Sequence, residues 1–136
     1  MTGARPTRDR GARGKAARVS GRRAEVLCAL LLMLKGYRIL GFRVPTREGE
    51  IDILATRGGV LAVVEVKRRA DTATALQAVT AEQRGRLRRA GGQIGAATPR
   101  LNGLSVRLDL IALAPGRLPR HIRDAWPSDS GEQQRV

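Results

Sequence analysis

Two acidic side chains are predicted to face each other across a β-hairpin. Gly58-Gly59 favours a tight two-residue turn between two apolar runs that are rich in β-branched residues. If Arg57 pairs with Val60, Asp52 stands directly opposite Glu65 on the same face. Opposed carboxylates repel each other unless a cation lies between them. The spacing therefore predicts a site for a divalent metal held by oxygen ligands.

Lys67 follows Glu65 by two residues and so points to the same side of its strand, where it can orient a water or stabilise an oxyanion. The alternative is a solvated strand end in which Glu50, opposite Lys67, forms a simple ion pair. A four-residue loop would also move Asp52 away from Glu65. The other face of the hairpin carries the apolar residues expected in the core: Ile51, Ile53, Val64 and Val66.

A mostly apolar helix is expected before the hairpin, capped by Ser20 and ended by Gly36. Its one acid, Glu25, borders apolar positions on the helical wheel. A carboxylate there needs either a basic partner or a place beside a metal. Alternatively, it is a first-turn glutamate that faces water and favours the helix dipole.

The remaining pattern predicts an α/β fold. Thr80-Ala81-Glu82-Gln83 matches a capping box, so a helix should start there and continue to about Ile94. The other expected elements are a strand at 37–44 ended by Pro45, a turn at 46–49, an irregular polar loop at 68–78, a loop at 95–103, a strand at 104–113 and a short edge strand or docking tail at 121–126.

The charge of the chain points to a polyanionic partner. The 136 residues carry a formal net charge of +14, which favours nucleic acid first and an anionic membrane second. Residues 1–19 are expected to form a disordered basic arm, residues 20–126 one domain and residues 127–136 a disordered tail. The arm follows a phosphate backbone or only aids solubility. The arginines expected to contact nucleic acid are Arg22, Arg23, Arg68, Arg69, Arg84 and Arg88, and a solvated surface is the alternative for each.

Other classes are excluded or disfavoured by composition. The single cysteine, Cys28, excludes an intrachain disulfide and is expected to be a buried small hydrophobe. The single histidine, His121, cannot form a histidine cluster, so a structural or surface role is expected. The longest apolar run, residues 26–34, is far short of the roughly 20 residues that a membrane span needs. A cytoplasmic protein that does not enter a membrane is the simplest expectation.

The order of these motifs resembles the PD-(D/E)XK nuclease superfamily, and within it the YraN-like family of small bacterial proteins. The motifs that carry the resemblance are GRRAE at 21–25, GEIDIL at 49–54, VEVKRR at 64–69 and RLDLI at 107–111. The resemblance implies a restriction-endonuclease-like αβββαβ core with a mixed sheet flanked by helices. It also implies relation to archaeal Holliday-junction resolvases, and with it a homodimer.

By position, the resemblance makes Asp52, Glu65 and the carbonyl of Val66 metal ligands, with Lys67 orienting water and Glu25 completing the site. The chain departs from the family at Gln83, where a lysine is usual, and at residues 71–74, where a Phe-Gly segment is usual. Both departures are expected to weaken phosphate binding without removing the acids.

The expected reaction is hydrolysis of a phosphodiester, in DNA rather than RNA, assisted by Mg²⁺ or Mn²⁺. Two alternatives stay open. One is a module with a nuclease fold that binds nucleic acid without cutting it. The other is an assembly protein that docks a partner through its apolar first helix.

Overall fold

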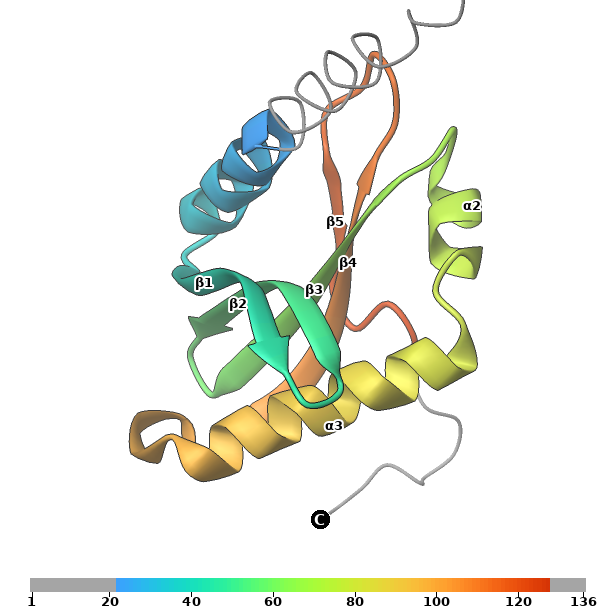
Figure 1. The fold of residues 1–136 in the computed structure, drawn as a ribbon. Helices are drawn as coiled ribbons and strands as arrows, with labels where there is room; N and C mark the ends of the chain where they lie inside the picture. The colour runs from blue at the N-terminus through green and yellow to red at the C-terminus, as the bar shows by residue number, and fades with distance from the viewer. Residues whose placement is uncertain (1–21, 128–136) are drawn as a thin grey trace, which may run out of the picture.

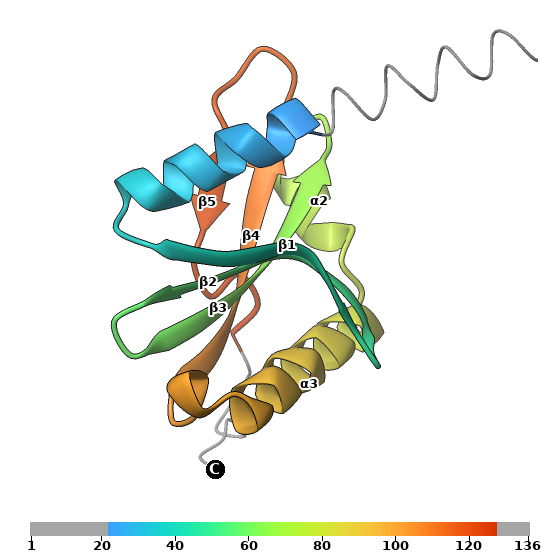
Figure 2. The ribbon, with the colours of Figure 1, turned by 60° about the vertical axis from the view of Figure 1, so that its left-hand side comes forward.

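The computed structural model describes residues 22–127, which fold around one five-stranded sheet in the order β1-β2-β3-β4-β5. A first helix, described over residues 22–34, packs on one face of the sheet, and α3 packs on the other (Figures 1 and 2). The predicted basic arm and all but the first residue of the predicted tail lie outside the described residues. The strands are β1 (Arg38–Thr46), β2 (Gly49–Arg57), β3 (Val60–Arg68), β4 (Ser105–Leu113) and β5 (Arg120–Ile122); the helices are α2 (Thr72–Gln77), α3 (Ala81–Ala97) and the 3₁₀ helix η1 (Pro99–Leu101).

The predicted hairpin is confirmed with its register. Arg57 pairs with Val60 across Gly58-Gly59, and the antiparallel pairing continues as far as Ile53 with Val64. Gly58 has a φ of 58°, the left-handed conformation that a tight primed turn requires. Beyond Ile53 the strand β2 pairs only with β1, while β3 continues parallel to β4. Glu50 therefore pairs with Pro45 rather than standing opposite Lys67, which corrects that prediction.

Each face of the sheet has its own core, which corrects the predicted single apolar face of the hairpin. Ile53 and Val64 pack with Cys28 and Leu32 of the first helix, whereas Ile51 packs on the α3 side. Strict alternation would place Ile51 and Ile53 together. The alternation breaks at the point where β2 leaves β3. Beside this point, β1 carries a register irregularity between Ile39 and Gly41 and a left-handed residue, Arg43, with a φ of 47°.

Strand β1 is longer than predicted because it is an edge strand. It continues through Pro45 to Thr46, and Pro45 pairs with Glu50. Proline cannot donate to a ladder, so it is tolerated at an edge and disfavoured inside a sheet. The predicted turn follows, where the Thr46 hydroxyl accepts a hydrogen bond from the Glu48 N–H at 3.0 Å.

Two helices differ from the prediction. Residues 72–77, expected to be irregular, form α2, which Asp71 caps by accepting a hydrogen bond from the Thr74 N–H at 2.8 Å. Helix α3 starts at the predicted cap, where Thr80 Oγ1 accepts from the Gln83 N–H at 3.1 Å. It continues beyond Ile94 to Ala97, because Gly91 and Gly95 lie buried against the sheet and its neighbours instead of ending the helix.

The C-terminal part of the described chain docks as predicted. Strand β5 pairs antiparallel with β4 at the other edge of the sheet. Trp126 is buried, and its indole N–H donates to the Leu76 carbonyl at 3.1 Å. Cys28 is fully buried, and burial raises the pKa of its thiol to about 11, as befits a small core residue. Within residues 22–127, no helix is long and apolar enough to cross a bilayer.

Candidate functional site

The predicted acids lie at a fork, where β2 and β3 part. Their backbone pairing stops at Ile53 and Val64, one residue before Asp52 and Glu65. Asp52 Oδ2 bridges the opening by accepting a hydrogen bond from the Val66 N–H at 2.8 Å. Asp52 also lies close enough to Glu65 to raise the pKa of the Glu65 carboxyl group. The structure thus brings Asp52, Glu65 and Val66 together, but Asp52 and Glu65 are not a paired position of the ladder, which corrects that part of the prediction.

Glu65 is a buried carboxyl group whose pKa is raised. Burial is the main cause that raises its pKa to about 8; the hydrogen bond and negative charge of Asp52 act in the same direction, and Lys67 opposes them. Glu65 is only 6% exposed to solvent. Gln83 Nε2, on the first turn of α3, donates to Glu65 Oε2 at 3.4 Å. The capping box is therefore only half formed, because the Gln83 side chain turns toward Glu65 instead.

Glu25 lines the same hollow as Asp52 and forms an ion pair with a basic group. Its Oε1 is 2.6 Å from Arg43 Nε, which answers the predicted need for a partner. The hollow has a volume of about 310 Å³, and Glu25, Arg43, Asp52 and Val66 line it with Ala24, Ile53, Arg68 and Leu113. Arg43 is a site residue that the sequence did not single out. Its only signal was that Glu25 needed a cation.

The acids fit a divalent metal by their chemistry. Mg²⁺ is usually held by one or two carboxylates and keeps several waters. A buried carboxyl group whose pKa is raised by a neighbouring acid is one at which a cation can replace the proton. Among residues 22–127, however, no three His, Cys, Asp or Glu side chains come together around one point. The protein would therefore supply Asp52, Glu65 and the Val66 carbonyl, with water and substrate completing the shell.

The predicted nucleic-acid-binding arginines divide into two groups. Arg23, Arg68 and Arg69 line one pocket beside the hollow, and Arg22 adjoins it on the first helix. Arg84 and Arg88 lie instead in the N-terminal half of α3, where both contact Trp126. The Arg84 guanidinium lies 6.0 Å from the centre of the indole, and Arg88 Nη2 donates to the Trp126 carbonyl at 2.6 Å.

A second buried polar cluster lies on the first-helix face of the sheet. Asp109 is fully buried and accepts both hydrogen bonds of an Arg107 fork at 2.7 Å, and a further bond from the Asp124 N–H. Burial raises the pKa of Asp109, but the hydrogen bonds from Arg107, His121 and Asp124 outweigh it and hold the pKa below its usual range.

His121 belongs to that cluster and is a structural residue, as expected for a lone histidine. Its ring lies between Asp109 Oδ2, 2.8 Å from Nε2, and Lys35 Nζ, 2.6 Å from Nδ1. Because a lysine ammonium only donates, Nδ1 accepts and Nε2–H donates to Asp109. The contact between Lys35 and His121 could not be predicted from sequence spacing, because 86 residues separate the two.

Comparison with known proteins identifies a family whose description names no activity. Residues 24–113 match the model of the uncharacterised protein family UPF0102. A UPF0102 protein of Caulobacter sp. strain K31 is 61% identical over 98% of this chain and all of its own length. UPF0102 proteins of Caulobacter vibrioides and Parvibaculum lavamentivorans are 63% and 45% identical over 86% and 85% of this chain, and over 94% and 86% of their own lengths.

Proposed function

Because the chain belongs to the uncharacterised protein family UPF0102, whose description names no activity, we propose its function from the site itself. The proposal is a metal-dependent nuclease that hydrolyses phosphodiester bonds of DNA. One observation carries it: the carboxyl groups of Asp52 and Glu65 are held together at the fork, with the pKa of Glu65 raised to about 8. An acid pair of this kind is costly in a fold that does not use it.

Each residue of the site has a defined task in this reaction. Asp52, Glu65 and the Val66 carbonyl hold Mg²⁺ or Mn²⁺, which when bound makes water more acidic and offsets phosphate charge. Lys67, beside Glu65 on β3, orients the attacking water and faces the charge that grows on the phosphate. The hydrogen bond from the Val66 N–H fixes Asp52, so the carboxylate does not have to be ordered when substrate arrives.

The charge of the chain supports a nucleic-acid partner. A net charge of +14 attracts a phosphate backbone without regard to sequence. Arg68 lines the hollow that also contains Asp52, so at least one arginine lies beside the acids. We propose DNA as the partner, a cytoplasmic location and a homodimer, the last by the resemblance to resolvases.

Two other functions each have an observation in their favour. A module that binds nucleic acid without cutting it is favoured by Glu25, because its carboxylate is already neutralised by Arg43 at 2.6 Å. An assembly protein is favoured by the first helix, where several large apolar side chains are at least half exposed: Val26, Leu27, Leu30, Met33 and Leu34.

The deciding experiment is a cleavage screen of branched, single-stranded and duplex DNA with Mg²⁺ or Mn²⁺. We expect the purified protein to cut at least one substrate. Asp52→Asn and Glu65→Gln, which keep the side-chain shapes, should each reduce the rate by about 100-fold or more. Glu82→Gln is the matched control, because Glu82 is an exposed acid on α3 and should keep full activity.

A binding assay in EDTA separates the three functions. The two site variants should still bind DNA, with an affinity that falls steeply as salt rises. Salt-sensitive binding without any cutting by the wild type would leave the non-catalytic module. If the wild type neither binds nor cuts DNA, the assembly protein is the remaining function. If the wild type and the site variants cut equally well, Asp52 and Glu65 do not take part in the reaction.

A further inference from the structure

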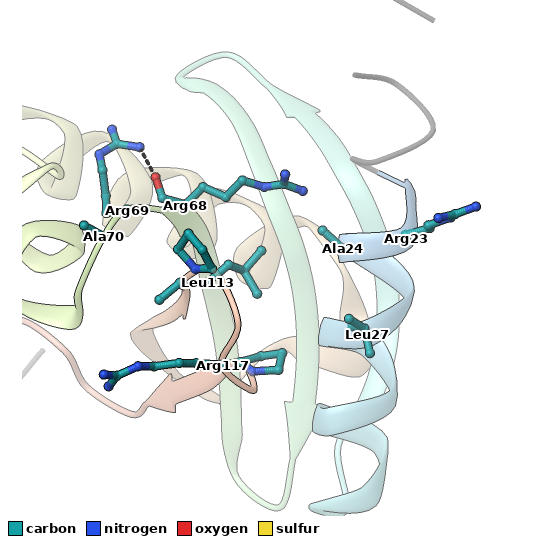
Figure 3. Close-up of a pocket in the computed structure, with 11 residues that line it drawn as sticks. Arg23, Ala24, Leu27, Arg68, Arg69, Ala70, Leu113 and Arg117 are labelled. Carbon is teal, nitrogen blue, oxygen red and sulfur yellow. Dashed lines mark hydrogen bonds between the residues drawn. The ribbon is translucent and has the colours of Figure 1, made fainter. Parts of the chain in front are cut away.

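A larger pocket opens directly beside the hollow that contains Asp52. Its volume is about 620 Å³, which lies within the range of pockets that bury a small organic ligand. Three segments far apart in the chain form its walls: the start of the first helix, the end of β3 and the loop from β4 to β5 (Figure 3). None of the assigned tasks of the acid site uses this pocket.

The lining of the pocket combines positive charge with an apolar surface. Among residues 22–127, four arginines line it and no acid does: Arg23, Arg68, Arg69 and Arg117. Between them lie Leu27, Leu113 and two prolines, Pro115 and Pro119. In Figure 3, Arg68 reaches from β3 toward the first helix above Leu113, while the side chains of Arg23 and Arg117 point outward on opposite sides.

Backbone hydrogen bonds hold the walls in place. The Arg69 N–H donates to the Leu113 carbonyl at 3.1 Å and ties the end of β3 to the end of β4. The Arg117 N–H donates to the Ala114 carbonyl at 3.2 Å and closes the turn that carries the rim. Arg69 Nη1 also donates to the Arg68 carbonyl at 2.7 Å (Figure 3). These bonds fix two of the three walls, the end of β3 and the start of the loop from β4 to β5.

This combination fits a nucleotide better than a bare phosphate chain. Phosphates need only the arginines, and an apolar surface contributes nothing to them. A nucleobase, in contrast, has a flat apolar face that stacks on guanidinium planes and packs against Leu and Pro side chains. A base in a duplex is already stacked and paired, so only an unpaired base is free to enter without an unpairing cost.

The pocket is also continuous with the acid site. Ala24, Arg68 and Leu113 line both the pocket and the hollow of Asp52. A nucleotide in the pocket therefore places its own phosphate near Arg68 and its neighbouring phosphodiester toward Asp52 and Glu65. We propose that the pocket takes one unpaired nucleotide of a DNA strand and so selects substrates that have a single-stranded segment. This inference rests on the nuclease function proposed above, because it names the substrate of the same site.

The test compares DNA strands with and without bases, in EDTA so that nothing is cut. One fluorescently labelled single strand carries its bases, and a second has the same phosphates but abasic sites in its central part. We expect the wild type to bind the complete strand about fivefold or more tightly, since stacking one base is worth roughly 1–3 kcal/mol. Equal affinity for the two strands would overturn the proposal.

Two leucines of the first helix give a matched pair of variants. Leu27 and Leu30 are both 50% exposed, but only Leu27 lines the pocket. Neither Leu27→Gln nor Leu30→Gln changes the net charge, so attraction to phosphates stays constant. Leu27→Gln should bring the affinity ratio of the two strands close to one, whereas Leu30→Gln should keep it. An equal effect of both substitutions, or of neither, would overturn the proposal.

Arginine variants test the rim in the same assay. Arg117→Gln should weaken binding of the complete strand more than Arg100→Gln does, because both side chains are exposed but Arg100 lies outside the pocket. Free dAMP as competitor distinguishes a strand from a small nucleotide. If dAMP displaced the complete strand at equal concentration, the site would serve a free nucleotide, and the proposal would be wrong.

The same proteins, assayed for cleavage with Mg²⁺, keep this inference separate from the proposed activity. If the wild type prefers the complete strand to the abasic strand but cuts no DNA, the proposed nuclease activity is wrong and the pocket for unpaired nucleotides stands. If the wild type cuts DNA but binds the two strands equally well, the nuclease activity stands and the proposed nucleotide pocket is wrong. If the pocket selects the substrate, Leu27→Gln should also lower the preference of cleavage for single-stranded over blunt duplex DNA, and Leu30→Gln should not.

Discussion

The backbone N–H of Val66 donates to Asp52 Oδ2 at 2.8 Å, in the place where β2 and β3 have stopped pairing with each other. A side chain thus satisfies a strand donor that the ladder has left open. The same bond fixes the carboxyl group of Asp52 against that of Glu65. The fork both creates the room for the acid pair and holds it in position, so the site follows from the way the two strands separate.

The stability of the metal-free protein should fall as pH rises through neutrality. The pKa of Glu65 is about 8 in the folded state against 4.5 for a free side chain, so between these values only the folded state keeps the proton. Each pH unit in that window then costs about 1.4 kcal/mol of unfolding free energy. Chemical denaturation in EDTA should show a loss on the order of 2 kcal/mol between about pH 5.5 and 7.5.

Glu65→Gln should remove most of this pH dependence and raise stability at neutral pH, because an amide cannot ionise. Glu82→Gln is the control, since Glu82 is exposed and its pKa is lowered by its bond with Arg86. Glu82 is ionised in both the folded and unfolded states throughout this window. A wild type whose stability is flat with pH would show that Glu65 is not held in its protonated form.

Mg²⁺ should stabilise the protein more at high pH than at low pH. The cation has to displace the proton that Glu65 keeps at low pH, so its binding is linked to the ionisation of Glu65. Thermal unfolding with and without Mg²⁺, at constant ionic strength, should give a larger rise in Tm at about pH 8 than at about pH 6. Asp52→Asn and Glu65→Gln should lose this rise. A rise that is the same in all three proteins would contradict a metal at this pair.

Gln83→Lys should lower the pKa of Glu65. Gln83 Nε2 already reaches Glu65 Oε2 at 3.4 Å, so a lysine there places a cation beside the carboxylate. We expect the pH-dependent loss of stability to become smaller, and denaturation curves across the same pH range to report it. Gln93→Lys, at an exposed position of the same helix, adds the same charge away from the acids and should leave the pH profile unchanged.

Asp109→Asn should destabilise the fold by about 3–5 kcal/mol, because it leaves the half-buried Arg107 guanidinium facing an amide in place of the buried carboxylate. The measurement is the free energy of unfolding by denaturant. Asp71→Asn is the control, since Asp71 is an exposed cap of α2 and asparagine caps helices equally well. Similar effects of the two substitutions would mean that the Asp109 cluster contributes little to stability.

Gly91→Ala and Gly92→Ala should have opposite effects. A Cβ at Gly91 would lie 2.8 Å from Val63 Cγ2 and 2.9 Å from Val106 Cγ1, so α3 would have to move off the sheet. We expect a loss of about 1–3 kcal/mol. A Cβ at Gly92 meets nothing within 4 Å, so alanine there should add up to about 1 kcal/mol through helix propensity. Equilibrium unfolding of the two variants checks both signs.

The parts of the fold that the sequence predicts are those set by local chemistry. Gly58-Gly59 permits one tight turn, and that turn alone fixes which residues of the hairpin face each other. Thr80 and Gln83 likewise mark the start of α3 within a single turn of helix. Asp52 and Glu65 could be placed near each other because they lie one residue beyond the last pair of the hairpin register, Ile53 with Val64.

Features that depend on distant contacts could not be predicted. The side taken by Ile51 follows from the separation of β2 and β3, which alternation along one strand does not contain. The bond of Glu25 to Arg43 joins a helix to the β1 edge strand, and any of many arginines could have filled that role. Lys35 and His121 meet only because the first helix packs on the sheet beside β5. Helix α2 is six residues long, too short for a periodic pattern, although Asp71 was a usable cap signal.

The β1 edge constrains how two copies of the chain can associate. An added strand needs an unbroken row of backbone donors and acceptors. Strand β1 interrupts that row three times, with the irregularity between Ile39 and Gly41, the left-handed Arg43 and Pro45, which has no N–H. The edge is therefore protected against continuous sheet growth, and with it against the stacking of chains that leads to fibrils. A homodimer of this protein is therefore not expected to form by joining two sheets along β1.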